Sequence, residues 1–157
     1  MNCFSIDTII GKLTIVYEGN TVISIGRDSD SDVHCCTADK PTFARQVVRE
    51  LEEYFSGQRK EFGFGIRMHG STFQTKVWNE LLKIPYGNTA TYGEIATRIG
   101  TPNASRAVGM ACNRNPLLIV VPCHRVVGHN GKLTGYAAGI RNKDILLNLE
   151  KEGYKKE

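Results

Sequence analysis

The change in hydrophobic spacing along the chain constrains its fold more than any other feature. Short stretches rich in Ile, Val, Thr and Tyr occupy residues 3–8, 12–18 and 21–26, with glycine-containing turns between them. This pattern predicts a small antiparallel β-meander. From Thr42 to Phe55 the apolar residues recur at helical spacing instead, so we expect a helix that covers the sheet. Residues 61–68 alternate loosely and predict one further strand.

Capping signals mark helices in the second half of the chain. Ser71 and Gln74 have the spacing of a capping box, and Thr91 and Glu94 repeat it. The first of these helices should end before Pro85 and bury Phe73, Val77, Trp78, Leu81 and Leu82. The elements expected after it are a helix to about Ile99, a helix from Ala104 to before Asn115, a buried strand at Leu117–Val121, a hairpin tip at Gly128–Gly131, a flexible segment at Gly135–Gly139 and a last helix at about Arg141–Lys151.

Two short helices joined by a glycine-containing turn resemble a helix-turn-helix, although most helical hairpins are packing units of a core. The predicted fold class is therefore α/β of the α+β kind. Residues 1–68 would form a small amino-terminal β-sheet plus helix, and residues 69–157 a mainly helical helix-turn-helix DNA-binding domain. A chain of 157 residues is long enough for two small domains that share a boundary.

Composition indicates an ordinary globular chain, with 41% hydrophobic and 23% charged residues. The longest aliphatic run, Leu117–Val121, is far shorter than the ~20 residues that span a bilayer, and no secretory signal is recognisable. The five cysteines form an odd set without regular spacing, which disfavours a secreted disulfide framework. We therefore expect no membrane association and a cytoplasmic protein, or a nuclear one if the source is eukaryotic.

Basic residues concentrate in the second half of the chain. Residues 1–70 carry 8 basic and 10 acidic side chains, whereas residues 71–157 carry 12 and 6. Between residues 81 and 143, eight Lys or Arg side chains face a single acid, Glu94. This balance favours a polyanion partner such as nucleic acid, although a basic surface can also be merely solvated.

The third predicted helix of the second half has the features of a nucleic-acid contact. Arg106, Asn113 and Arg114 occur there among small residues such as Ala107. Small side chains allow a helix to approach a DNA backbone closely, and a long Arg can then reach into the base stack. This helix is the predicted DNA-binding surface.

Cys123 is the candidate nucleophile. A cysteine attacks only as a thiolate, which needs a base, a cation or a helix terminus nearby. His124 is adjacent, but it serves as the base only if the chain turns at Pro122 or a water bridges the two side chains. Glu150 is the best-placed acid to orient His124, by elimination. The alternative is a buried structural cysteine with a surface histidine beside it.

The residues around Cys123 carry a family resemblance. Pro122–Val126, preceded by Ile119–Val121 and followed by Gly135–Tyr136, resembles the active-site signature of the O6-alkylguanine-DNA alkyltransferases, also called methylated-DNA–protein-cysteine methyltransferases. The resemblance extends in order over roughly half of the chain. Its further segments are Gly70–Gln74 with Val77–Trp78, Tyr92–Ala96, Arg106–Gly109, Leu133–Tyr136 and the final helix to Glu150.

The resemblance implies an enzyme that repairs DNA by direct reversal. Such a protein binds double-stranded DNA bearing O6-alkylguanine through the minor groove, flips the damaged base out of the stack and moves the alkyl group irreversibly onto its own cysteine. O4-alkylthymine would be a second substrate. The protein would be a monomer, need no cofactor and act once, because the resulting thioether is not cleaved.

Roles of individual residues follow from the same resemblance. Cys123 is the acceptor, His124 the base acting through a water, and Glu150 the group that orients His124. Tyr92 crowds the phosphate backbone and donates its hydroxyl to the guanine ring. Arg106 is the finger that fills the gap left by the flipped base, and Ala107, Asn113 and Arg114 complete the DNA-binding surface.

The resemblance also implies a substrate pocket. Asn115 braces the turn before the active site, and the carbonyls of Cys123 and Val126 read the guanine exocyclic amine. Tyr136 walls the pocket. Ala137 stands where relatives often have serine, so only its backbone amide could donate to the guanine O6, which leaves the pocket size open.

Other functions and sites were weighed against this one. An alkyltransferase-like protein would bind O6-alkylguanine without repairing it, but such relatives replace the acceptor cysteine. A helix-turn-helix regulator leaves the Pro-Cys-His-Arg run unexplained, and a cysteine hydrolase or thiol oxidoreductase would need an oxyanion hole or a resolving cysteine. No metal is expected, because the set Cys3, His34, Cys35 and Cys36 lacks standard zinc spacing. The role of Cys112 stays open between a partner in oxidation and inert core.

Overall fold

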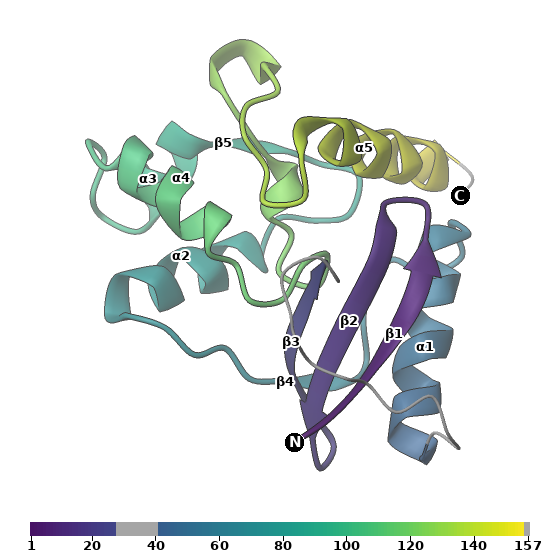
Figure 1. The fold of residues 1–157 in the computed structure, drawn as a ribbon. Helices are drawn as coiled ribbons and strands as arrows, with labels where there is room; N and C mark the ends of the chain where they lie inside the picture. Colours follow the sequence, from purple (N-terminus) through teal and green to yellow (C-terminus); the bar gives the residue numbers. More distant parts are fainter. Residues whose placement is uncertain (28–40, 156–157) are drawn as a thin grey trace. The chain divides into compact units, whose positions relative to one another are not determined.

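The computed structural model describes residues 1–27 and 41–155. The chain divides into two compact units, Met1–Met68 and His69–Glu157, each of which is described by itself (Figure 1). The predicted α+β class is confirmed. Within the described ranges, no helix has the length and apolar character needed to cross a membrane. The acidic loop predicted at Asp28–Asp32 lies outside the described residues.

The first unit contains the predicted meander. Strands β1 (Asn2–Thr8), β2 (Gly11–Glu18) and β3 (Thr21–Arg27) pair antiparallel in this order. The strand predicted at residues 61–68 shrinks to β4 (Gly65–Ile66), which runs parallel to β3. It begins where β3 begins, because Gly65 pairs with Thr21, and the preceding Gly63 N–H donates to the Glu50 carboxylate (2.5 Å).

Helix α1 (Thr42–Phe55) has the predicted bounds and packs on this sheet. The ring of Phe43 lies 5.6 Å from the ring of Tyr17 on β2. The core between sheet and helix is formed by aliphatic and aromatic side chains of both: Phe4, Leu13, Ile15, Val22, Ile25, Val47, Leu51 and Tyr54. Cys3 of β1 is disulfide-bonded, which the cysteine spacing did not predict.

In the second unit, the predicted capping box begins helix α2 (Thr72–Leu81). The Gln74 N–H donates to the Ser71 hydroxyl, and the Ser71 N–H donates to the Gln74 side chain. Trp78 is buried and its indole N–H donates to the Ala111 carbonyl (2.9 Å). The buried face was predicted too long at both ends, because Phe73 is only half-buried and Leu82 follows the end of the helix and is 40% exposed.

Helices α3 (Tyr92–Arg98) and α4 (Ser105–Asn113) form the predicted pair (Figure 1). The Glu94 N–H donates to the hydroxyl of Thr91, so Thr91 caps α3, but the predicted capping box is incomplete because the Glu94 carboxylate accepts from the Thr91 hydroxyl (3.3 Å) and not from its backbone N–H. The last helix, α5 (Ile140–Lys155), is longer at its end than predicted.

Between α4 and α5 the sequence predictions fail in two places. Leu117–Val121 is largely buried as predicted but forms a turn and not a strand, since Ile119 has a positive φ of 74° and the Val121 N–H donates back to Leu117. Gly128–Gly131 is no hairpin tip. It is a 3-10 turn, η3 (His129–Gly131), closed by the Gly128 N–H on the Lys132 carbonyl.

The short strand before this turn pairs elsewhere. It is β6 (Val126–Val127), and it runs parallel to β5 (Ala90–Thr91), which immediately precedes α3. The pairing connects the segment after Cys123 to the start of the helix-turn-helix.

Candidate active site and DNA-binding surface

A 3-10 turn, η2 (Cys123–Arg125), carries the candidate nucleophile and its neighbours. The Cys123 N–H donates to the Val121 carbonyl (2.8 Å) and the Arg125 N–H to the Pro122 carbonyl (3.0 Å), so the chain turns where the sequence left this open. The side chains of this turn do not alternate as in a strand. Cys123 is 2% exposed and His124 is fully buried.

Asn115 holds this turn from the end of α4. Its side-chain amide donates to the Val121 carbonyl (2.7 Å) and to the Cys123 Sγ (3.1 Å), and its Oδ1 accepts from the Leu117 N–H (2.9 Å). A single buried amide thus fixes both the loop and the thiol. The bracing position that the resemblance implied for Asn115 matches this geometry.

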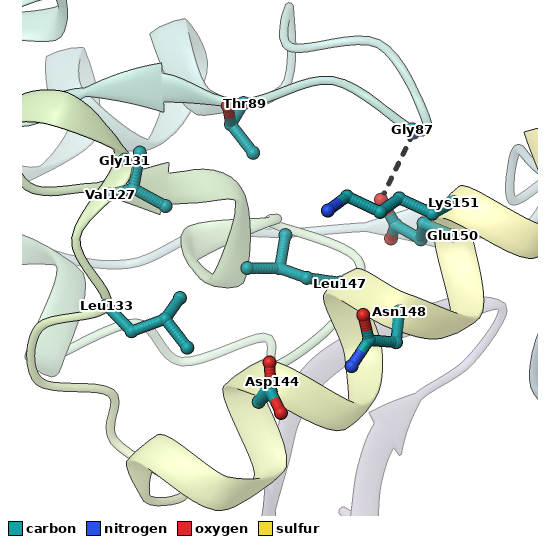
Figure 2. A pocket seen from close by; sticks show the side chains of 10 residues that line it. All are labelled: Gly87, Thr89, Val127, Gly131, Leu133, Asp144, Leu147, Asn148, Glu150 and Lys151. Carbon is teal, nitrogen blue, oxygen red and sulfur yellow. Dashed lines mark hydrogen bonds between the residues drawn. The ribbon is translucent and has the colours of Figure 1, made fainter.

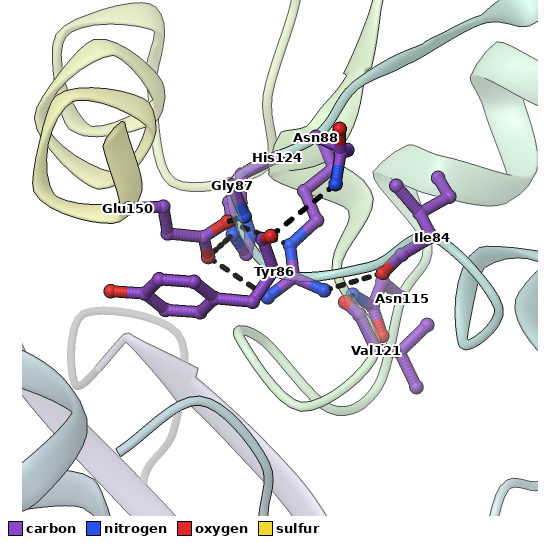
Figure 3. Close-up of polar contacts among 9 residues, drawn as sticks. Ile84, Tyr86, Gly87, Asn88, Asn115, Val121, His124 and Glu150 are labelled. Atoms are coloured by element: carbon purple, nitrogen blue, oxygen red, sulfur yellow. Dashed lines mark hydrogen bonds and ion pairs between the residues drawn. The ribbon is translucent and has the colours of Figure 1, made fainter. Parts of the chain in front are cut away.

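His124 and Glu150 meet within the second unit, although 26 residues separate them in sequence. The His124 Nε2 lies 2.6 Å from the Glu150 Oε2 (Figure 3). Arg125 donates to both oxygens of the same carboxylate, at 2.8 Å from Nε and 3.0 Å from Nη2, and also to the Ile84 carbonyl. The Gly87 N–H adds a longer bond of 3.3 Å to Glu150.

Arg125 was missed by the sequence analysis, which counted it among the basic residues of the second half. Its neighbours in sequence give no sign that it is 7% exposed and pairs with Glu150. A bidentate Arg–carboxylate pair is among the strongest hydrogen-bonded ion pairs. Arg125 therefore fixes the carboxylate to which His124 is bonded.

The ionisation of this pair follows from burial and hydrogen bonding. Burial opposes ionisation of Glu150, but the hydrogen bonds from His124 and Arg125 outweigh it and hold the pKa of Glu150 well below its ordinary value. Burial lowers the pKa of His124, against the opposing effect of Glu150. The pair therefore rests as a carboxylate and a neutral imidazole. Because the carboxylate only accepts, the imidazole proton is on Nε2 and Nδ1 is the basic atom.

The Cys123 thiol is protonated at rest. Burial raises its pKa to about 11, although the hydrogen bond from Asn115 and the charge of Lys143 act in the opposite direction. The second free cysteine, Cys112 of α4, has a pKa raised to about 12 by burial. A thiolate at either position needs a base, and Cys123 has an imidazole in the next residue.

Lys143 was also missed by the sequence analysis. It is fully buried, and its ammonium group donates to the carbonyls of Val126 (2.5 Å) and Thr134 (3.1 Å) and to the Tyr92 hydroxyl (3.5 Å). Burial lowers the pKa of Lys143, which the two cysteines partly offset. Lys143 joins α5 to the segment that follows Cys123.

Tyr92 lies between this network and helix α4. Its hydroxyl accepts from Thr134 Oγ1 (3.1 Å) and donates to the Gly135 carbonyl (3.4 Å). A Cβ at Gly109 of α4 would lie 3.7 Å from the Tyr92 ring, which is an ordinary van der Waals distance, so the ring packs close to the α4 backbone. Burial raises the pKa of Tyr92, so its phenol keeps the proton at neutral pH.

The remaining predicted pocket residues lie in β6, which contains Val126, and in the segment after it, which contains Tyr136 and Ala137. Tyr136 is buried, with its ring 6.4 Å from that of His124, and its hydroxyl has no hydrogen-bond partner among the described residues. Ala137 is exposed. The Val126 carbonyl already accepts from Lys143, but a carbonyl oxygen has a second lone pair.

Four of the predicted DNA-binding residues lie at the two ends of α4, Arg106 and Ala107 in its first turn and Asn113 and Arg114 at its C-terminus. Arg106, Asn113 and Arg114 are exposed, and Ala107 is partly exposed. Neither arginine forms an ion pair with another residue in the described part of the chain. An open groove of about 530 Å³ passes Arg106, Asn113, Tyr92 and Gly135. Cationic groups thus stay available beside this groove.

A second cavity lies on the carboxylate side of the His124–Glu150 pair (Figure 2). It has a volume of about 300 Å³ and is lined by Glu150 and Leu147 of α5, by Gly87 and by Val127. Cys123 does not line it, so the cavity is not the space in which a group reaches the sulfur.

No metal site is found in the described ranges, where no three His, Cys, Asp or Glu side chains are grouped suitably. His34, Cys35 and Cys36, which were weighed as zinc ligands, lie outside the described residues.

Comparison with known proteins gives consistent matches. The sequence model for "6-O-methylguanine DNA methyltransferase, DNA binding domain" matches residues 72–152. A methylated-DNA–protein-cysteine methyltransferase of Methanosarcina acetivorans is 59% identical over 108 residues, which is 69% of each chain. The protein of that name from Mycobacterium tuberculosis is 46% identical over 151 residues, covering 94% of this chain and 90% of the relative.

Solved structures agree with the sequence matches. The crystal structure of Mycobacterium tuberculosis OGT in complex with DNA has a TM-score of 0.89 and 45% identity, and covers 98% of this chain and 94% of that one. These likenesses define the class as DNA-binding enzymes of the methyltransferase type. The chain belongs to the 6-O-methylguanine DNA methyltransferase family, as the sequence resemblance predicted.

Proposed function

We propose that this protein repairs DNA by moving the alkyl group of O6-alkylguanine directly onto Cys123. The observation that carries the proposal is the buried Cys123 thiol in one turn with His124, whose imidazole is 2.6 Å from the Glu150 carboxylate. A buried thiol with a pKa of about 11 is a poor nucleophile by itself. The neutral imidazole, held by an ionised carboxylate, supplies the missing base.

The proposed step balances as follows. His124 takes the thiol proton through a water, and the sulfur attacks the alkyl carbon. The S–C bond forms while the C–O6 bond breaks, and its electron pair goes to the guanine ring. Tyr92 donates a proton to the ring, and the proton lost by the thiol replaces it, so guanine leaves neutral. The product is a thioether at Cys123.

Access to the sulfur requires base flipping. Cys123 is 2% exposed, so a base stacked inside a duplex would not reach it, and the nucleotide must rotate out of the stack. We assign Arg106 to the gap that the base leaves and Tyr92 to crowding of the phosphate backbone. Arg114, Asn113 and Ala107 would contact the minor-groove side of the duplex. Support comes from the exposed, unpaired arginines and from the DNA complex of the similar mycobacterial structure.

The proposed pocket holds guanine through backbone groups. The carbonyls of Cys123 and Val126 accept from the exocyclic amine, and the Ala137 amide donates to O6. Tyr136 walls the pocket with its ring, and Asn115 keeps the thiol aimed at the alkyl carbon. Lys143 acts through other groups, because it fixes the Val126 carbonyl and the Tyr92 hydroxyl.

Each protein molecule would act once, as a monomer and without a cofactor, on O6-alkylguanine and on O4-alkylthymine. The test is intact-protein mass spectrometry after mixing with a duplex containing one O6-methylguanine. We expect a gain of one CH₂ per chain that saturates at one, and no gain for Cys123→Ala. Lesion binding without a mass gain would instead identify a protein that only flags lesions. If the protein neither gained mass nor bound the lesion, Cys123 would be a structural residue.

A further inference from the structure

Met110 is the one large apolar side chain exposed on the recognition helix α4, and the proposed function does not use it. It is 62% exposed, more than any other large hydrophobic residue described in the second unit. It lines the same open groove as Arg106 and Tyr92. Burial in the core therefore does not explain its position.

The position of Met110 relative to Arg106 shows which way its side chain faces. The two residues are four apart on one helix, so their side chains lie on the same face, one turn from each other. Helix α4 contains no acidic residue, so the surface that surrounds Met110 suits a polyanion. If Arg106 occupies the gap that the flipped base leaves, Met110 faces the neighbouring base-pair step of the same duplex.

Methionine suits such a contact because its side chain is unbranched and adapts to irregular surfaces. Proteins that bind the minor groove often insert an apolar wedge between base steps, which unstacks the step and bends the duplex. We propose that Met110 is such a wedge: it enters the minor groove beside Arg106 and opens the base step next to the lesion. This rests on the proposed function, because it assumes that α4 faces the minor groove.

The test compares Met110→Ala with Met110→Leu, both in the Cys123→Ala background so that no chemistry consumes the complex. The probe is a duplex with one O6-methylguanine and 2-aminopurine as its neighbour, whose fluorescence rises when the step opens. Ile140→Ala is the control, since Ile140 is 51% exposed but does not line the groove. Thermal unfolding of each variant checks that the fold is kept.

We expect Met110→Ala to bind the duplex about tenfold more weakly, in line with the loss of one buried apolar side chain. It should also lose most of the fluorescence rise, while Met110→Leu and Ile140→Ala behave as the parent. Unchanged binding by Met110→Ala overturns the inference, and so does weaker binding with a full fluorescence rise. Reaction of the unmutated chain with the free base O6-methylguanine, which needs no duplex, reports the chemistry separately. Its absence would count against the proposed function and not against the Met110 wedge.

Discussion

The second unit contains two kinds of charged site among its described residues, one buried and paired and the other exposed and unpaired. At Glu150 the charges are buried and paired: the carboxylate accepts from the Arg125 guanidinium, and also from the neutral His124 and the Gly87 N–H. On α4 and just after it, Arg106 and Arg114 are exposed and form no ion pair with the described residues. Interior charges of the first kind hold one ionisation state and one geometry. Surface charges of the second kind are left for a partner to neutralise.

The largest loss of stability should come from removing the buried carboxylate of Glu150. Glu150→Ala leaves the Arg125 guanidinium without its carboxylate, and breaking a buried pair in this way costs about 3–5 kcal/mol of unfolding free energy. Glu152→Ala is the matched control, because Glu152 is on the same helix and exposed. Urea unfolding of both variants checks this. Equal stabilities would mean that the buried network contributes nothing to the fold.

Asn115→Ala should have the next largest effect. It removes the partner of the Val121 carbonyl, the Leu117 N–H and the thiol, and each buried group left unsatisfied costs about 1–3 kcal/mol. The pKa of Cys123 should rise further, so alkylation should slow. Asn148→Ala, which removes an exposed Asn side chain on α5, serves as the comparison. Similar alkylation rates in the two variants would show that the Asn115 side chain does not assist the Cys123 thiol.

The pH dependence separates a base-assisted thiol from a preformed thiolate. Burial sets the pKa of His124 below 6.5, so His124 is neutral above that pH and becomes protonated only in more acidic solution. The alkylation rate with a free base should therefore be flat from about pH 7 to 9 and fall only when the pH drops through the lowered pKa of His124. A rate that rises tenfold per unit across the flat range would show that the thiol ionises without His124.

The pH dependence of the free energy of unfolding should also be governed by Glu150 and His124. The folded pKa of Glu150 is lowered, so its contribution is complete above its unfolded pKa near 4.3 and is lost as the pH falls through the folded value. The folded pKa of His124 is also lowered. Because the unfolded chain binds this proton first, stability begins to decrease below about pH 6.5. Denaturant titrations at several pH values in Glu150→Gln and in the parent measure the difference.

The smallest change in stability should come from substituting an arginine that is proposed to contact DNA. Arg114→Ala should change the free energy of unfolding by less than about 0.5 kcal/mol. It should lower the slope of log affinity against log salt by about 0.9, the value for one phosphate contact. Arg49→Ala in α1 controls for net charge. An unchanged salt slope would show that Arg114 does not face the phosphates.

Local signals allowed part of this structure to be predicted. The capping pairs Ser71/Gln74 and Thr91/Glu94 act within one turn of chain, so they located two helix starts directly. The strand expected at residues 117–121 failed because an apolar run shows burial but not backbone direction, which the positive φ of Ile119 reverses. The bracing by Asn115 is equally local and was predicted only by resemblance.

Long-range contacts explain what the sequence could not show. Arg125 and Lys143 were counted as surface charges, because nothing near them in sequence reveals that one meets Glu150 and the other Val126. Glu150 was selected only because the second half contains few acids. Its contact with His124 depends on how α5 packs against η2, which no local pattern encodes.

The central claim is that Cys123, and not the other buried thiol, receives the alkyl group. Trypsin separates the two cysteines that are free among the described residues, since cleavage after Arg106, Arg114 and Arg125 leaves Cys112 in residues 107–114 and Cys123 in residues 115–125. After reaction with a duplex containing O6-methylguanine, tandem mass spectrometry should find the added methyl group on the peptide of residues 115–125 alone. A methyl group on residues 107–114, or on neither peptide, would contradict the account.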